Sequence, residues 1–152
     1  MSIRISEKKV NRNEYQILAA YKFVDENYDY VGKVSVCYYC LYGMTDMEYL
    51  IIPQHQNKGY ATTAVKLVLK DIFCNKTLDG HIFLNAYGKA NKTDCNAVGL
   101  QISKDNIASL KVARNNGFKI TEYKTSYNGE ITREMFKHLR IKQAQTEQEM
   151  GR

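Results

Sequence analysis

The sequence predicts a mixed α+β domain, in which a long sheet is flanked by at least two helices. Its first half is rich in β-branched and aromatic residues, which favour strands. Two later segments carry apolar residues at spacings of three and four, which favour helices. Strands followed by helix, strand, helix and further strands form an order typical of α+β folds. The 152 residues fit one domain, which we place at residues 1–140, followed by a polar tail at 141–152.

Three strands are expected before the first helix. Tyr15–Val24 and Tyr30–Tyr39 are separated by a polar turn, and Asp46–Ile52 follows them. The third strand ends at Pro53, the only proline, which cannot donate a hydrogen bond to a neighbouring strand. A helical pattern then begins at Gly59 and continues to residue 73.

The middle of the chain is less regular. Residues 81–87 are expected to form a strand or a buried loop, and the polar residues 88–96 a surface loop. Residues 98–103 favour another strand. A short second helix, Ile107–Asn115, is expected to be capped by Asp105 or Asn106 and to end before a left-handed Gly117.

The C-terminal part favours two strands and a polar extension. Residues 118–124 and 130–139 are expected to be strands, with Asn128-Gly129 as a strong hairpin signal between them. Residues 142–152 are polar and rich in Gln and Glu. We expect them to be a frayed helix or disordered.

Composition excludes several functional classes. Hydrophobic residues make up 44% and charged residues 25% of the chain, and no apolar run approaches the roughly 20 residues that span a bilayer. The first residues lack the character of a signal peptide, so we expect a cytoplasmic protein without a membrane partner. The net charge of +6 favours anionic ligands, but the basic residues are scattered, and no nucleic-acid partner is expected.

The cysteines do not indicate a metal centre. Cys37 and Cys40 form a C-x-x-C pair, but no second Cys/His pair completes a set of four zinc ligands. On a strand, residues three apart point to opposite faces. Free thiols in a reducing compartment are the better interpretation, and no metal is expected. Cys95 lacks an evident histidine partner, which argues against a cysteine nucleophile.

The segment from Gln56 to Ala61 has the features of a diphosphate site. A strand ends, a polar turn follows and an amphipathic helix begins, so the free N–H groups of the first helical turn form an anion site. Gly59 has no Cβ and allows a close approach of the ligand. Lys58 adds a positive charge and Gln56 an amide donor. The alternative is that Gly59 serves only as a helix-entry turn.

Two blocks together resemble the GCN5-related N-acetyltransferase (GNAT) superfamily. Gln56-x-x-Gly59-x-Ala61 is similar to its Q/R-x-x-G-x-G/A signature, and Asn106–Phe118 resembles a later motif. The pattern is nearest to the branch that acetylates the N-terminal amines of ribosomal proteins (RimJ/RimL type). The resemblance covers roughly residues 15–138. It implies a mostly antiparallel, splayed sheet and contacts with acetyl-CoA from Ile51, Ile52, Gln56, Asn57, Lys58, Gly59, Tyr60, Ala61, Thr62, Asn106 and Ser109.

The resemblance implies that an acetyl group passes directly from acetyl-CoA to a primary amine in a ternary complex. The acceptor is expected to be a small molecule or a peptide or protein N-terminus, and the enzyme a monomer or a homodimer. A non-catalytic acyl-CoA sensor or scaffold of the same fold is the alternative. A nucleic-acid-binding protein is a third possibility, which rests on net charge alone.

Direct transfer needs a base, because an ammonium group is not a nucleophile. Asp46 and Glu48 are the candidates, since residues two apart on a strand share a face. The family's usual tyrosine acid would fall at Ala113 and is missing. Ser109, which stands where the N-terminal acetyltransferase branch has a serine, is the candidate donor to the leaving thiolate, with Tyr123 and Tyr127 as weaker alternatives. A helix-surface role for Ser109 remains open.

Overall fold

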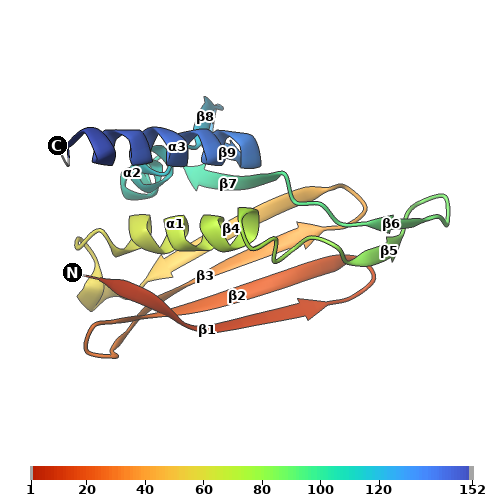
Figure 1. Ribbon diagram of the computed structural model, residues 1–152, viewed down its shortest axis with the longest axis horizontal. Coiled ribbons are helices and arrows are strands. Elements are labelled where there is room, and N and C mark those ends of the chain that lie inside the picture. Colours follow the sequence, from red (N-terminus) through yellow and green to blue (C-terminus); the bar gives the residue numbers. More distant parts are fainter. Residues whose placement is uncertain (1, 151–152) are drawn as a thin grey trace.

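The computed structural model describes residues 2–150 and has the mixed α+β architecture that the sequence predicts. Seven strands form one sheet in the order β1-β2-β3-β4-β7-β9-β8. Its strands are β1 (Ile3–Arg12), β2 (Gln16–Asp25), β3 (Tyr30–Tyr39), β4 (Met44–Ile51), β7 (Ala97–Ser103), β8 (Lys119–Glu122) and β9 (Ser126–Thr132). A separate hairpin of β5 (Ile82–Leu84) and β6 (Ala90–Lys92) projects from the end opposite the two chain termini (Figure 1).

The sheet is antiparallel except at its centre. Strands β4 and β7 run parallel and are bridged at one position, where Asp46 lies opposite Gly99. Beyond this bridge β4 remains paired with β3 and β7 with β9, so the two central strands separate. The sheet therefore opens into a V towards the end of β4, and backbone groups along its edges are left for other partners.

Three helices contribute to one hydrophobic core. They are α1 (Tyr60–Phe73), α2 (Ile107–Asn115) and α3 (Arg133–Met150), and a short 3₁₀ turn, η1 (Pro53–His55), precedes α1. Val65 and Leu69 of α1, Ala113 of α2 and Phe136 of α3 belong to the same buried cluster as Tyr21 of β2. The helices therefore lie on one side of the sheet, as Figure 1 shows for α1 over β3 and β4.

The other face of the sheet carries exposed side chains. Along β4, Thr45, Met47 and Ile51 are buried, whereas the alternate residues Asp46 and Glu48 are exposed. We call this side the open face. Cross-strand register fixes which residues of neighbouring strands share it, because directly paired residues point the same way.

A buried carboxylate joins α1 to the first two strands. Asp71 accepts hydrogen bonds from the Tyr21 hydroxyl (2.6 Å) and the Thr77 hydroxyl (2.7 Å) and forms an ion pair with Lys8 (2.8 Å). Burial alone would raise the pKa of Asp71, but these donors, with Asn75, outweigh it and lower the pKa to about 2. The same burial, with Asp71 beside it, raises the pKa of Tyr21 above its usual value.

The expected strand at 130–139 is wrong beyond its third residue. Strand β9 ends at Thr132, and α3 begins at Arg133. The Thr132 hydroxyl accepts the backbone N–H of Met135 at 3.1 Å, as an N-cap does. The helix continues to Met150, so the polar tail expected at 141–152 is helical as far as the structure describes it.

The Asn128-Gly129 hairpin turn is also wrong. Both residues lie inside β9, and the chain turns at residues 123–125 instead. A Cβ on Gly129 would meet side-chain atoms of Ile120 at 3.3 Å and Phe118 at 3.4 Å. Glycine is used here for close packing rather than for a turn.

Two strands were missed. The sequence prediction placed nothing at β1, which pairs with β2 along its whole length. The loop expected at 88–96 contains β6, which pairs with β5. Each of these strands pairs with one neighbouring strand. That pairing, rather than the strand's own composition, determines that the segment is extended.

Candidate active site

The turn between β4 and α1 is left-handed at two positions. Asn57 has φ 63° and Gly59, the N-cap of α1, has φ 77°. No side chain caps α1, so the backbone N–H groups of Ala61 and Thr62 in its first turn can meet an anion. A Cβ built on Gly59 meets nothing within 4 Å, so any side chain at this position would project into the open space above the turn.

Gln56 braces this turn. Its side-chain amide donates to the backbone carbonyl of Ile51 at 2.9 Å, which ties the turn to the end of β4. The sequence prediction used the same amide as a donor to phosphate. The Lys58 ammonium lies 5.9 Å from the ring centroid of Tyr60, at the entrance to the helix.

The N-terminus of α2 faces this turn across the V. Asn106 caps α2 by accepting the Ser109 N–H at 3.1 Å, as expected from the sequence. The Ser109 carbonyl accepts the hydroxyl of Tyr49, from β4, at 3.1 Å. At the other end of α2, the Asn116 amide donates to the carbonyl of Thr62 in α1 at 3.1 Å. These bonds fix the spacing between the two helices.

A cavity of about 600 Å³ lies between the two helices and the end of β4. Its volume is within the range of small-molecule sites. Of the eleven residues expected to contact the cofactor, Ile52 and Lys58 do not line it. The other nine do: Ile51, Gln56, Asn57, Gly59, Tyr60, Ala61, Thr62, Asn106 and Ser109.

The candidate bases lie on the open face, on the same strand as the cavity residues Tyr49 and Leu50 but outside the cavity lining. Asp46 and Glu48 are exposed, and an Asp46 carboxylate oxygen lies 3.6 Å from where a Cβ on Gly99 would be, at the point of the V. A hydrogen bond with Cys37 raises the pKa of Tyr39, and the charges of Asp46 and Glu48 raise that pKa further. The Tyr39 phenol therefore lies close enough to Asp46 and Glu48 for their charges to affect its pKa.

Sequence reasoning missed two polar groups of the cavity. Burial raises the pKa of Tyr49, although its bond to Ser109 opposes the shift. The Nδ1 atom of His55 is buried without a hydrogen-bond partner among residues 2–150. Both residues line the cavity, but only the fold brings the Tyr49 hydroxyl to α2 and buries the His55 ring nitrogen.

Tyr123 and Tyr127, the weaker acid candidates, lie elsewhere. Tyr123 is exposed in the turn between β8 and β9. The Tyr127 ring stacks under the Lys104 ammonium, which lies 4.5 Å from its centroid. Neither residue lines the cavity at α2.

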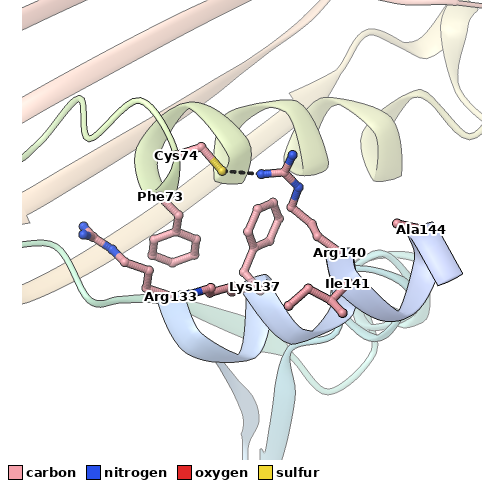
Figure 2. Close-up of a pocket in the computed structure, with 8 residues that line it drawn as sticks. Phe73, Cys74, Arg133, Lys137, Arg140, Ile141 and Ala144 are labelled. Atoms are coloured by element: carbon pink, nitrogen blue, oxygen red, sulfur yellow. Dashed lines mark hydrogen bonds between the residues drawn. The ribbon is translucent and has the colours of Figure 1, made fainter.

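A second cavity lies between the C-terminal end of α1 and α3 (Figure 2). Phe73 and Phe136 pack there with ring centroids 5.6 Å apart, and the Arg140 guanidinium donates to the Cys74 sulfur at 2.6 Å. These contacts attach α3 to α1. None of the residues predicted to act in catalysis lines this cavity.

Residues 3–119 match the sequence model of the acetyltransferase (GNAT) domain. The chain belongs to this GNAT acetyltransferase family. The match covers more than half of the chain and includes β4, the turn at Gly59 and α2. No curated protein sequence matches the chain.

Solved structures share the fold of this GNAT acetyltransferase. Spermidine N-acetyltransferase from Vibrio cholerae, in complex with CoA and spermine, matches with a TM-score of 0.61 and 15% identity over 78% of this chain and 68% of that one. Mutant forms of the spermidine/spermine N-acetyltransferase SpeG from the same organism match with a TM-score of 0.60 and 14% identity over 80% of this chain and 70% of that one. At these identities the likeness concerns the fold.

Family membership establishes the reaction. The GNAT acetyltransferase is an enzyme that transfers an acetyl group from acetyl-CoA to an amine. Within residues 2–150, no group of three or more His, Cys, Asp or Glu residues is arranged to hold a metal ion. Over the same residues, no helix combines the length and hydrophobicity that crossing a bilayer requires.

Proposed function

We propose that the enzyme binds acetyl-CoA in the cavity between α1 and α2 and transfers the acetyl group directly to an amine in a ternary complex. The observation that supports this placement is the shared cavity, where the uncapped start of α1 meets Asn106 and Ser109 of α2. The diphosphate would accept hydrogen bonds from the N–H groups of Ala61 and Thr62 in the first turn of α1. The pantetheine arm would extend along the edge of β4 that β7 leaves unpaired.

Asp46 and Glu48 are proposed to receive the proton of the attacking amine. They lie at and just beyond the bridge to Gly99, where the V opens and the thioester would sit. Glu48 precedes Tyr49 and Leu50, which line the cavity, and Asp46 marks the point of the V. A proton can pass to either carboxylate directly or through one water molecule.

Ser109 is proposed to stabilise the departing thiolate, in place of the tyrosine that Ala113 replaces. Its backbone groups are occupied by Asn106 and Tyr49, and the side chain lies on the cavity. Ala113 is fully buried and belongs to the core instead. A serine at this position supports assignment to the branch that acetylates protein N-termini.

The acceptor is proposed to approach from the open face, because the helices and the cofactor occupy the other side. Vibrio cholerae relatives by fold act on spermidine, and one binds spermine. A peptide or small-molecule amine fits the same two carboxylates. The four free cysteines suit the cytoplasm, which we propose as the site of action.

The direct test is calorimetric titration with acetyl-CoA, followed by a free-thiol assay with a panel of amines. We expect saturable binding of acetyl-CoA and thiol release only when an amine is present. Binding without turnover of any amine would favour the sensor or scaffold. A folded sample that binds no acetyl-CoA at high micromolar concentration would refute the placement.

A further inference from the structure

We propose that the acceptor is a polypeptide N-terminus whose first side chain is large and apolar. This inference rests on the proposed function, since it takes the Asp46–Glu48 pair as the place where the amine is acetylated. It concerns a patch beside that pair, formed by Leu18, Tyr39 and Met44, which we call the apolar patch.

Strand register places the apolar patch next to Asp46. On the open face, Leu18 lies opposite Cys37 and Cys37 opposite Asp46. Tyr39 follows two residues after Cys37 and lies opposite Met44. Adjacent strands are about 5 Å apart, so all three patch residues lie within about 10 Å of the carboxylate. A single large side chain on the first residue can reach from the amine to the patch.

The patch is exposed to solvent. Leu18 and Tyr39 are each 38% exposed and Met44 is 58% exposed. Three neighbouring apolar side chains at the edge of a reaction site are unusual for a solvated sheet face, which is normally polar. Covering them with an apolar substrate side chain releases ordered water and stabilises the complex.

The charges around the pair suit a single ammonium group. Glu130 lies opposite Gly99, which lies opposite Asp46, but Lys119 lies opposite Glu130, so this third carboxylate of the row has a lysine beside it. Towards the other end of β4 the open face carries Lys33, which lies opposite Lys22, and Lys22 is itself paired with Glu7 at 3.1 Å. A second ammonium of a polyamine would meet either these lysines or the apolar patch. The arrangement therefore favours a monoamine with an apolar neighbour.

The shape of the open face favours a polypeptide over a small amine. Small ligands usually bury most of their surface in a concave site. A sheet face touches a small amine on one side only, whereas an extended peptide gains contact area with its length. An N-terminus also carries its first side chain one carbon away from the amine, which matches the closeness of the patch to Asp46.

The test compares peptides of equal length that differ only in their first residue. With saturating acetyl-CoA, we expect kcat/KM to be about tenfold or more higher for first residue Phe or Leu than for Ser. Spermidine and 2-phenylethylamine, as small amines, should be poorer substrates than the Phe peptide. Equal kcat/KM for Phe and Ser peptides, or a preference for either small amine, would overturn the inference.

Variants assign the preference to the patch. Leu18→Gln and Met44→Gln should each reduce the ratio of kcat/KM for the Phe peptide to that for the Ser peptide. The control is Leu84→Gln, a change at a similarly exposed position on the β5–β6 hairpin, which should leave the ratio unchanged. An unchanged ratio in both patch variants, when they are folded, contradicts the role of the patch. If acetyl-CoA binds but no acceptor turns over, the proposed function fails and the inference falls with it.

Discussion

Single residues provide the sharpest tests of the cofactor site, and Gly59 comes first. Gly59→Ala should lower the affinity for acetyl-CoA about tenfold or more, because the added Cβ enters the open space at the turn, which the diphosphate is proposed to occupy. It should also cost about 1 kcal/mol of stability, because φ is 77°. Calorimetric titration and urea unfolding measure the two effects.

Gly43→Ala is the matched control for this change. Gly43 has φ 62° and equally open space around it, but it lies in the turn before β4 and does not line the cavity. It should destabilise the protein by a similar amount and leave acetyl-CoA binding unchanged. Equal affinities for the two variants would count against Gly59 as the diphosphate site.

The carboxylate pair makes a second prediction at the residue scale. The double variant Asp46→Asn/Glu48→Gln should lose about 100-fold or more in kcat, since general-base catalysis contributes that much. Its affinity for acetyl-CoA should stay close to wild type, because neither residue lines the cavity. The single variants, followed across pH, show which carboxylate takes the proton. Wild-type kcat in the double variant would remove the pair from the mechanism.

The roles of single residues could be predicted from the sequence where they depend only on neighbouring residues in the chain. Asn106 caps the helix that begins one residue later, and the Gly59 turn is read from six consecutive residues. The sequence predicted that the Gln56 amide donates to phosphate. In the structure it donates to the Ile51 carbonyl, a partner that comes within reach only when the turn folds. Tyr49 and His55 were missed for the same reason, since the bond of Tyr49 to Ser109 and the burial of the His55 Nδ1 atom arise only on tertiary packing.

At the scale of elements, Asp71 holds α1 against β1 and β2, and its pKa makes stability depend on pH. The folded pKa of about 2 lies below the ordinary 3.8, so folding favours the ionised form. The resulting stabilisation, about 2 kcal/mol, is complete above about pH 4 and is lost as the pH falls through about 2. Asp71→Asn should therefore lower the free energy of unfolding at pH 7.

Urea unfolding at several pH values checks this prediction. The difference between wild type and Asp71→Asn should shrink steadily from about pH 4 towards pH 2, because the wild-type carboxylate becomes protonated there. A difference that stays constant over this range would mean that the charge of Asp71 does not stabilise the fold.

A second prediction about elements concerns the hydrogen bond that joins α2 to α1. Asn116→Ala removes the buried amide that donates to the Thr62 carbonyl, which should cost about 0.5–1.5 kcal/mol. Because this bond sets the width of the cavity, acetyl-CoA affinity should fall as well. Asn91→Ala, at an exposed position of β6, is the control. Loss of stability with full affinity would show that the bond does not shape the site.

The bounds of helices could be predicted where the apolar spacing and the capping residues are clear in the sequence. Helix α2 has the predicted bounds, and α1 begins within one residue of the predicted start. The strand expected at 130–139 was wrong beyond Thr132, because the Thr132 hydroxyl accepts the Met135 N–H and α3 begins at Arg133. The Asn-Gly turn failed because Phe118 and Ile120 pack on Gly129, a contact that only the assembled sheet creates.

At the scale of the whole molecule, we propose that the two substrates bind on different sides of one sheet. The fold class followed from the order of elements, but the separation of β4 from β7 depends on which strands pair, and no local pattern encodes that choice. The open face likewise becomes visible only when the register brings Leu18, Cys37 and Asp46 into one row. The sequence predicted the cofactor residues and the two candidate bases, but not the surface that surrounds those bases.

The central claim is that acetyl-CoA bound between α1 and α2 gives its acetyl group to an amine at the Asp46–Glu48 pair. The most direct measurement follows thiol release and acetylation of a Phe-first peptide together, by a thiol reagent and mass spectrometry. The account predicts one thiol released for each N-terminus acetylated, and loss of both products in the Asp46→Asn/Glu48→Gln variant. Thiol release without peptide acetylation, or undiminished acetylation by that variant, would contradict it.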